Sequence, residues 1–502
     1  MSSSEVIDSV PETTDDELNR ILSGAAEAAG PFGALPPKTR AAHLVAVADA
    51  LHAHDDELVE LAIAESGLPD ARLRGELNRT AVQLRLFAEV LARGAYLDVV
   101  LDAADPDFAI GPRPDLRRVK LPIGPVLVYA ASNFPFAFSV IGGDSASALA
   151  AGCPVVLKSH PGHPRLSART GQVVADALRT AGAPDGVFAV IHGDRQGVDA
   201  LRDERIAAAA FTGSVAGGRA LFDIAAARPR PIPFFGELGS NNPVFVTPGA
   251  VRARGAEIAR GYVESFTLGV GQFCTKPGLL FLPADHGLED ALVEAVRAVP
   301  GARMLTEKVS RGYGSRHDAI LAAAGVRTLV DGGDPDGLAA APTLAATDSG
   351  TLLDRGADLL DEAFGPLSIV VGYDKVDELP VLAAALEPSL TATVHLDADD
   401  PADTESARPL VTRLAEQAGR VLFNGWPTGV AVTPAMHHGG PYPSTTAPLH
   451  TSVGSRAIDR FLRPVVFQNA PAALLPDALR DDNPLGLPRE TNPAGESRTW
   501  GS

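Results

Sequence analysis

Two side chains with chemistry of their own, Glu237 and Cys274, lie in the middle of this sequence. Cys274 is followed by Thr-Lys-Pro-Gly, a run that is typical of a loop rather than of a packed face. A thiol attacks as the thiolate, so it needs a group that promotes its ionisation or a nearby base. Glu237, in a turn flanked by glycine, is the candidate base or water activator. The alternative is that Cys274 is a small buried hydrophobic residue.

Polar side chains also follow two apolar runs that have the length of buried strands. Asn133 follows the first run, and its amide could donate to a developing oxyanion or cap a local turn. Lys158 follows the second run, at the place where a common dinucleotide fold has an acid that holds the adenosine ribose. Ser159 and Pro161 come next, and no acid follows them. A basic site without an acid favours a 2′-phosphate on the adenosine ribose of a dinucleotide. The alternative is that Lys158 binds no ligand and lies at a solvated strand end.

A further strand-like run ends in a glycine-rich turn. Gly213 and Ser214 form this turn, and Gly217 and Gly218 then open a helical pattern. Glycines let the backbone approach a phosphate, and a helix N-terminus attracts one. The spacing differs from the GxGxxG fingerprint of dinucleotide-binding proteins, so the pattern alone is a weak indication.

Parallel sheets would bring these strand ends to one edge, and the sequence predicts two such sheets. Residues 18–94 carry apolar side chains at three-to-four spacing and predict helices. From Gly124 apolar strands alternate with helical patterns, one of them over 136–152, and a second alternation runs from Glu237 to Gly429. Such alternation is typical of an α/β fold with helices on both faces of each sheet. The segment 112–124 is polar on both sides and predicts a projecting hairpin.

Length, charge and cysteine content bound the function further. A chain of 502 residues predicts two or more domains, and its net charge of −19 argues against binding nucleic acid or an anionic membrane. Two distant cysteines make no disulfide framework and indicate a reducing compartment. Cys153, which begins an apolar strand, is predicted to be a core residue. No apolar run reaches membrane-spanning length, and the polar, acidic start resembles no secretory signal, so we predict a cytoplasmic protein.

Seven motifs, in this order and across nearly the whole chain, resemble those of the NAD(P)-dependent aldehyde dehydrogenase superfamily. They are SNFPF, VVLKSHP, FTGSVAGG, ELGSNNPVF, GQFCTKPG, EAFGPLSIV and LFNG. The resemblance implies an aldehyde dehydrogenase-like fold with two Rossmann-like parallel-sheet domains and a small β oligomerisation element. It assigns a cofactor-binding domain to 1–110 and 124–236, a catalytic domain to 237–453, and an oligomerisation hairpin and C-terminal segment to 111–123 and 454–502.

The resemblance also implies a role for each motif residue. Cys274 matches the nucleophile that forms a thiohemiacetal and then a thioester with the aldehyde. Asn133, with the backbone N–H of Cys274, matches the oxyanion hole, and Glu237 matches the base that activates water for thioester hydrolysis. No metal is implied. The implied contacts to the NAD(P) cofactor are Lys158, Ser159, Pro161, Gly213, Ser214, Gly218, Leu238, Glu362 and Phe364.

Departures from the commoner sequences of the superfamily point to one branch of it. Ser240 and Asn241 replace the usual Gly-Lys after Glu-Leu-Gly, and Pro161 replaces a usual glutamate. With the late string MHHGGPYPSTT, these features resemble the branch of 2-oxoglutarate semialdehyde (2,5-dioxovalerate) dehydrogenases and NADP-dependent fatty aldehyde dehydrogenases. We therefore expect NADP to be preferred and NAD to be used as well. Lys276, where this branch usually has asparagine, is expected to bear on the charge of the pocket.

Several functions remain open at this point. The favoured one is oxidation of 2-oxoglutarate semialdehyde, and the alternative is oxidation of a fatty aldehyde. A CoA-acylating enzyme usually lacks the glutamate that Glu237 matches, and a catalytically idle protein would not need Asn133, Glu237 and Cys274 together. A Cys-His thiol hydrolase would leave the two α/β alternations without a purpose.

The expected partners follow from the favoured function. A small-molecule aldehyde is the substrate, and copies of the chain form a homodimer or homotetramer. A substrate carboxylate would need a cation near it, which any of several arginines could supply, Arg456 among them.

Overall fold

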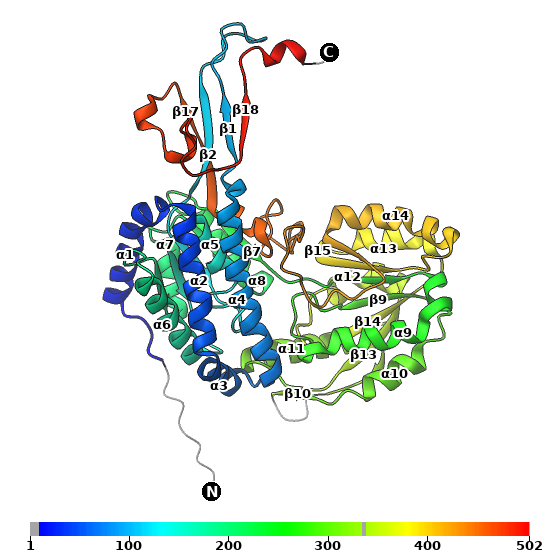
Figure 1. The fold of residues 1–502 in the computed structure, drawn as a ribbon. Coiled ribbons are helices and arrows are strands. Elements are labelled where there is room, and N and C mark those ends of the chain that lie inside the picture. The colour runs from blue at the N-terminus through cyan, green and yellow to red at the C-terminus, as the bar shows by residue number, and fades with distance from the viewer. Residues whose placement is uncertain (1–9, 334–337, 501–502) are drawn as a thin grey trace.

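Three larger β-sheets organise the part of the chain that the computed structural model describes, residues 10–333 and 338–500 (Figure 1). The five-stranded and the seven-stranded sheet lie side by side with their helices, and the four-stranded sheet projects from the body (Figure 1). A two-stranded ribbon pairs β10 (Ala302–Arg303) with β12 (Ala339–Ala340). None of the described helices combines the length and the apolar character that a membrane span requires.

Four helices precede the first sheet: α1 (Asp15–Gly33), α2 (Pro37–Ala53), α3 (Asp55–Ser66) and α4 (Asp70–Arg93). Helix α1 begins with a capping box, because the Thr14 hydroxyl accepts from the backbone of Glu17 while the Glu17 carboxylate accepts from the backbone of Thr14. Helix α4 ends at Gly94, whose φ of 72° lies in the left-handed region that glycine adopts without strain.

The first sheet has five parallel strands in the order β5-β4-β3-β6-β7. The strands are β3 (Val126–Tyr129), β4 (Val155–Lys158), β5 (Phe188–Ile191), β6 (Ala208–Thr212) and β7 (Phe234–Glu237). The helices between them are α5 (Gly143–Ala151), α6 (Pro164–Thr180), α7 (Asp194–Arg202) and α8 (Val215–Ala226). The order reverses between β3 and β6, and ligands of open α/β sheets bind in the crevice at such a point, at the carboxyl ends of the strands.

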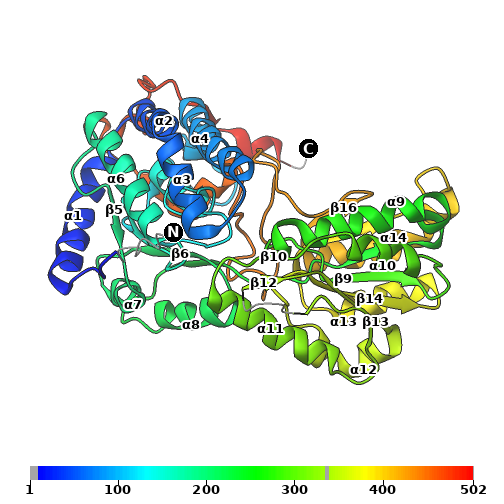
Figure 2. The same ribbon diagram turned by 90° about the horizontal axis from the view of Figure 1, so that it is seen from below.

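Alternate residues of each strand in this sheet pack on opposite faces. Val126 and Val128 belong to a core with α2, α4, α5 and α6, whereas Leu127 and Tyr129 belong to a core with α1, α7 and α8. Figure 2 shows α2, α3, α4 and α6 together on one side and α7 and α8 on the other. The predicted parallel sheet with helices on both faces is confirmed.

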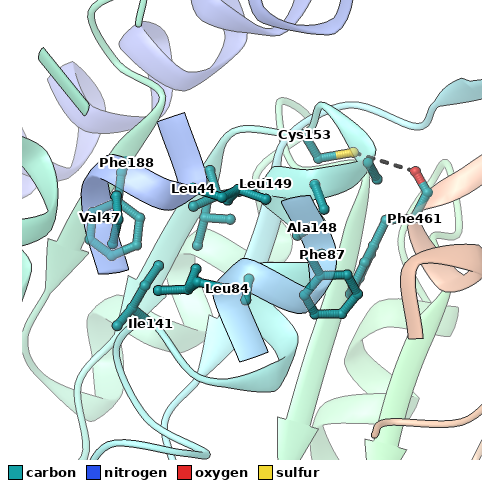
Figure 3. Packing of buried hydrophobic residues seen from close by; sticks show 14 of the residues in the cluster. Leu44, Val47, Leu84, Phe87, Ile141, Ala148, Leu149, Cys153, Phe188 and Phe461 are labelled. Carbon is teal, nitrogen blue, oxygen red and sulfur yellow. Dashed lines mark hydrogen bonds between the residues drawn. The ribbon is translucent and has the colours of Figure 1, made fainter. Parts of the chain in front are cut away.

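Cys153 belongs to the larger of these cores (Figure 3). Its side chain is fully buried, and its sulfur lies 3.4 Å from the carbonyl oxygen of Phe461. Burial raises the pKa of this thiol to about 11. The prediction that Cys153 is a core residue is confirmed.

The second sheet has seven strands in the order β11-β13-β14-β9-β8-β15-β16, parallel except for the edge strand β11. The strands are β8 (Val244–Val246), β9 (Leu279–Pro283), β11 (Arg327–Val330), β13 (Thr343–Asp348), β14 (Leu367–Tyr373), β15 (Ser389–His395) and β16 (Ala418–Phe423). Its helices are α9 (Pro248–Thr267), α10 (Glu289–Arg297), α11 (Glu307–Leu321), α12 (Ser349–Leu359), α13 (Leu379–Ala385) and α14 (Pro401–Gln417). Cores on the two faces of this sheet confirm the second α/β alternation.

The third sheet is built from distant segments in the order β17-β2-β1-β18. The strands are β1 (Val99–Asp102), β2 (Leu116–Pro122), β17 (Leu462–Gln468) and β18 (Arg489–Asn492). The hairpin predicted within 112–124 is therefore one strand, β2, and its antiparallel partner in the hairpin is β1. Strand β1 lies in the range 1–110 that the resemblance gave to the cofactor-binding domain, yet its backbone pairs only within this third sheet.

The helix predicted over 136–152 forms only from Gly143 onward, as α5. The chain folds back on itself just before it, so that a Cβ atom on Gly142 would lie 2.2 Å from the carbonyl oxygen of Ala137. Helix α7 was not predicted from the sequence. Short 3-10 helices complete the described chain: η1 (Ala95–Leu97), η2 (Leu268–Gly271), η3 (Val376–Glu378), η4 (Ser455–Phe461), η5 (Ala472–Leu474), η6 (Asp477–Leu479) and η7 (Glu496–Thr499).

Candidate active site

Cys274 lies in the turn between η2 and β9, and its side chain is half-buried. The amide of Asn242 fixes this turn, donating to the carbonyl oxygens of Cys274 at 2.9 Å and Lys276 at 3.0 Å. Asn242 is itself fully buried and adopts a left-handed φ of 47°. The thiol is therefore carried by a rigid loop, as the Thr-Lys-Pro-Gly run predicts.

A histidine joins the two side chains that the sequence singles out. The Nε2 atom of His438 lies 3.6 Å from the sulfur of Cys274 and 2.7 Å from Oε1 of Glu237. The contact to sulfur is a hydrogen bond, whereas the contact to Oε1 is an ion pair without hydrogen-bond geometry. This agrees with an Nε2–H group that can point at only one acceptor. Thiol, imidazole and carboxylate thus meet although 37 and 164 residues separate Cys274 from Glu237 and from His438.

The charges of these groups stabilise one another. Burial alone would lower the pKa of His438, but the neighbouring Glu237 and Cys274 raise it to about 10. Burial alone would raise the pKa of the Glu237 carboxyl, yet His438 and Ser452 outweigh it, so this pKa lies below its usual range. At neutral pH an imidazolium therefore lies between a carboxylate and the nucleophilic sulfur.

Both oxygens of Glu237 are engaged in this arrangement. Ser452 donates a very short hydrogen bond to Oε2, while His438 contacts Oε1. The backbone N–H of His438 in turn donates to Thr451 Oγ1 at 2.8 Å. Glu237 has to leave one of these partners before it can take a proton from water.

Asn133 lies beside the loop that carries Cys274. It is buried at the end of β3, and its Nδ2 donates to the carbonyl of Gln272, two residues before Cys274, at 3.1 Å. Arg72 holds the turn from the other side, because its Nη2 donates to the carbonyl of Asn133 at 2.6 Å. One N–H of the Asn133 amide remains for a ligand.

The structure brings an acid to the end of β4, where the sequence predicts none. Lys158 is buried there, and its Nζ forms an ion pair with Asp194, the first residue of α7. The sequence argument missed this acid because Asp194 comes from the end of the neighbouring strand β5 and not from the residues after β4. The expectation of an acid-free site is therefore wrong.

The other polar residues after β4 contribute hydrogen bonds but no charge. The Ser159 hydroxyl is buried and bonded to Nδ1 of His192 at 2.7 Å. Burial, with the charges of His163 and Lys158, lowers the pKa of His160 to about 3, so its imidazole is neutral. Pro161 is exposed beside them.

The glycine turn after β6 has the features of a phosphate site. Gly213 and Ser214 are exposed at the carboxyl edge of the sheet, and the Ser214 hydroxyl caps α8 by accepting from the N–H of Gly217 at 3.2 Å. Gly218 allows close packing, because a Cβ atom there would lie 2.1 Å from the buried Leu238 side chain. An exposed helix N-terminus at the switch point of the sheet fits the diphosphate of a dinucleotide.

Glu362 and Phe364 lie half-buried on the loop between α12 and β14. Lys276 ties this loop to the nucleophile, donating to the carbonyls of Ala363 at 2.8 Å and Leu367 at 2.9 Å. Burial raises the pKa of Glu362 to about 7 despite Lys276, and burial lowers the pKa of Lys276 to about 8 despite Glu362. The charge of Lys276 therefore acts mainly on the neighbouring Glu362.

Sequence reasoning assigned no role to His438, Ser452, Asn242 or Asp194. His438 lies in the string MHHGGPYPSTT, which served only as a mark of resemblance. Neither periodicity nor spacing distinguishes it from the adjacent His437. The sequence also predicts no metal site, yet Glu237, Cys274 and His438 offer an oxygen, a sulfur and a nitrogen ligand within 4.8 Å of one another. Such a set suits zinc.

Comparisons with known proteins agree with this geometry. Residues 2–464 match the family described as "Aldehyde dehydrogenase family". Alpha-ketoglutaric semialdehyde dehydrogenase of Acinetobacter baylyi is 43% identical over 487 residues, covering 96% of this chain and 92% of that protein. Alpha-ketoglutaric semialdehyde dehydrogenase 2 of Azospirillum brasilense is 44% identical over 485 residues, covering 94% and 90%.

A solved structure extends the likeness to the fold. The NAD-dependent aldehyde dehydrogenase of Sinorhizobium meliloti superposes with a TM-score of 0.74 at 26% identity, covering 92% of this chain and 89% of that one. The family match, the long relatives and the fold agree with one another. This chain belongs to the aldehyde dehydrogenase family.

Proposed function

We propose that this protein oxidises 2-oxoglutarate semialdehyde to 2-oxoglutarate with a nicotinamide cofactor. The observation that carries the proposal is that His438 contacts both Cys274 and Glu237. Asn133 donates a hydrogen bond to the loop that carries Cys274. The substrate follows from the two relatives of 43% and 44% identity, whose names give alpha-ketoglutaric semialdehyde, the same compound.

The first half of the reaction forms a carbon–sulfur bond. The thiolate of Cys274, next to the His438 imidazolium, attacks the aldehyde carbon, and the carbonyl oxygen becomes an oxyanion. The Nδ2 of Asn133 and the backbone N–H of Cys274 donate to that oxyanion. NAD(P)+, when bound, supplies the acceptor for the hydride that leaves the carbon. The carbonyl then re-forms as a thioester on Cys274.

The second half releases the acid. Glu237, freed from Ser452 or His438, takes a proton from a water molecule that attacks the thioester carbon. The carbon–sulfur bond breaks, 2-oxoglutarate leaves, and the sulfur returns to the thiolate beside the imidazolium. His438 contacts both Cys274 and Glu237, and this proximity supports Cys274 as the nucleophile and Glu237 as the base of the same reaction.

The residues proposed to hold the cofactor lie along the crevice of the first sheet. The exposed start of α8 at Ser214 would hold the diphosphate, Lys158 the adenosine ribose, and Glu362 with Phe364 the nicotinamide ribose and ring. We propose that NADP is preferred over NAD, because Pro161 has neither charge nor acceptor to repel a 2′-phosphate. The ion pair of Lys158 with Asp194 opposes this preference and makes it modest.

The assembly is proposed to be a homodimer or a homotetramer in the cytoplasm. The projecting four-stranded sheet supports this, because its two edge strands, β17 and β18, have unpaired sides that another chain can cover. Light scattering at micromolar concentration tests it, and a monomer would contradict it.

Steady-state kinetics test the function. We expect kcat/KM for 2-oxoglutarate semialdehyde to exceed that for decanal with either NADP or NAD. Decanal is the matched comparison, since it carries the aldehyde without a carboxylate and represents the fatty aldehyde alternative. A preference for decanal would refute the proposed substrate, and no reduction of either cofactor would refute the reaction.

A further inference from the structure

Two arginines near Cys274 have buried N–H groups without an acceptor. Nη1 of Arg79 and Nε of Arg420 are both buried, and neither has a hydrogen-bond partner in the described structure. Arg79 packs on the ring of Phe138, which contacts Phe134 and through it Phe273, the residue before Cys274. Arg420 follows Gly419, where a Cβ atom would lie 2.2 Å from the carbonyl oxygen of Gly439, the residue after His438. An unsatisfied buried donor on a charged group is costly, so each of these groups has room for a further acceptor, and an anionic acceptor would suit its charge.

Arg79 reaches this place from helix α4, on the side of the first sheet. Its guanidinium carbon lies 5.3 Å from the centre of the Phe138 ring, in the turn that follows Asn133. Glu76, one turn earlier on the helix, acts on Arg79 through its charge but forms no ion pair with it, and its Oε1 accepts from the N–H groups of Phe136 at 2.8 Å and Ala137 at 2.9 Å. Arg79 therefore keeps a charge and a free donor beside the oxyanion turn.

Arg420 reaches the same place from β16, on the side of the second sheet. Its Nη1 and Nη2 donate to the carbonyls of Gly429 at 3.2 Å and Pro427 at 2.8 Å. These two bonds fix the plane of the guanidinium and leave Nε for a further acceptor. No carboxylate of the described chain forms an ion pair with Arg79 or Arg420.

Other arginines fit this role less well. Arg72 already donates to the carbonyl of Asn133 and stacks between the rings of Phe134 and Phe273. Arg456, the example that the sequence offered, has a side chain that is 69% exposed and lies 3.5 Å from Asp459. An exposed, paired arginine gives little discrimination, because water and the paired acid compete for its donors.

We propose that Arg79 and Arg420 form a carboxylate subsite that holds the 2-oxo acid end of the substrate while Cys274 attacks the aldehyde end. This inference rests on the proposed function. The two ends of the substrate are four carbon–carbon bonds of about 1.5 Å apart, so an extended molecule spans about 5 Å. The far carboxylate therefore stays near the groups that pack around the nucleophile, which Arg79 joins through Phe138 and Arg420 through the segment of His438. The two arginines come from the two halves of the protein, so the subsite lies between them.

Substrate selectivity measures the subsite directly. We compare kcat/KM for 2-oxoglutarate semialdehyde with that for pentanal, which has the same five carbons and no carboxylate, in Arg79→Met and Arg420→Gln. Each substitution should lower the ratio of the two values about ten- to a hundredfold, the range of one charge-assisted hydrogen bond. The loss should appear mainly in KM for the semialdehyde. Arg85→Met is the matched control, because Arg85 lies on the same helix, is exposed and pairs with Asp49; its ratio should equal that of the parent.

The possible outcomes separate this proposal from the proposed function. A parent enzyme without preference for the semialdehyde over pentanal overturns the function and the subsite with it. A parent with that preference whose ratio survives in both variants overturns the subsite alone. Arg79→Lys covers the case in which Arg79→Met does not fold, because lysine keeps the charge but lacks the several N–H donors of a guanidinium. An intermediate ratio in Arg79→Lys supports the subsite. An unchanged ratio in both Arg79→Lys and Arg420→Gln overturns it.

A binding measurement gives a second readout without turnover. In Cys274→Ala, titration with 2-oxoglutarate should show binding that Arg79→Met weakens about ten- to a hundredfold. A second titration with hexanoate, which has a carboxylate but no 2-oxo group, reports whether the carboxylate alone is recognised. Equal affinity for 2-oxoglutarate with and without Arg79 would overturn its role.

Discussion

Replacing His438 by asparagine removes the positive charge that lies 3.6 Å from the sulfur of Cys274. Two unit charges at 3.6 Å interact by about 4.6 kcal/mol at an effective dielectric constant of about 20. This energy is an upper limit for what the thiolate loses, because the carboxylate of Glu237, within 4.8 Å of the sulfur, offsets part of the attraction of the imidazolium. A less stabilised thiolate is also more nucleophilic, with a slope of about 0.5, so at most about half of that energy, a loss of up to about 50-fold, appears in the rate of attack.

Alkylation by iodoacetamide as a function of pH is the direct assay, because it needs neither cofactor nor substrate. Cys153 is fully buried, so the reaction reports on Cys274. In the parent, the pKa of about 10 for His438 keeps the imidazolium through the neutral range. The rate at pH 7 should therefore be higher in the parent than in His438→Asn, by up to about 50-fold, and the difference should shrink as the pH rises.

His437→Asn is the matched control. His437 is half-buried next to His438, and burial together with the charge of His438 lowers its pKa, so at neutral pH it is uncharged. Its replacement should leave the alkylation profile as in the parent. A His438→Asn profile that superimposes on the parent profile would refute the ion-pair argument.

Four further outcomes follow from the described site. Cys274→Ala should abolish aldehyde oxidation, while Cys153→Ala should retain it, and comparable activity in the two would contradict the nucleophile. Glu237→Gln should give a burst of reduced cofactor and then stall at the thioester, which stopped-flow absorbance detects; loss of the burst with steady turnover intact would exclude Glu237 as the base of hydrolysis. Pro161→Glu should shift the ratio of kcat/KM values for the two cofactors toward NAD, and Asp194→Asn should shift it toward NADP; an unmoved ratio in both would rule out the charge argument. Zinc ions should inhibit the enzyme by binding the sulfur, nitrogen and oxygen ligands of the active site, and a chelator should reverse the inhibition, whereas indifference to zinc would refute that site.

The strand ends of the first sheet could be predicted from the sequence for a physical reason. In a parallel sheet, apolar runs of four or five residues mark the strands, and whatever follows each run must lie at one edge. Asn133 and Lys158 were found in this way, whereas Glu237 and Cys274 were singled out by their side-chain chemistry and turn context, and motif resemblance then implied their roles. The predicted site residues that the structure brings into contact are those that end a strand or lie in a short loop.

His438 and Asp194 could not be found by the same reasoning. His438 belongs to the long irregular segment after β16, where no period ties a residue to a face, and only the folded chain brings it 164 residues back to Cys274. Asp194 begins a helix that was not predicted, so its approach to Lys158 from the neighbouring strand end stayed hidden. Local pattern predicts elements, whereas contacts between distant loops depend on how the elements pack.

Lys276 makes two loops of the active site inseparable for protein engineering. Its Nζ lies deep in the interior and satisfies the carbonyls of Ala363 and Leu367, on the loop that carries Glu362. A shorter residue such as asparagine would not reach both carbonyls, and each buried carbonyl without a donor costs about 1–3 kcal/mol. A chimera that imports the nucleophile loop of a relative therefore has to import residues 360–367 with it. The two segments, 84 residues or more apart along the chain, form a single unit of exchange.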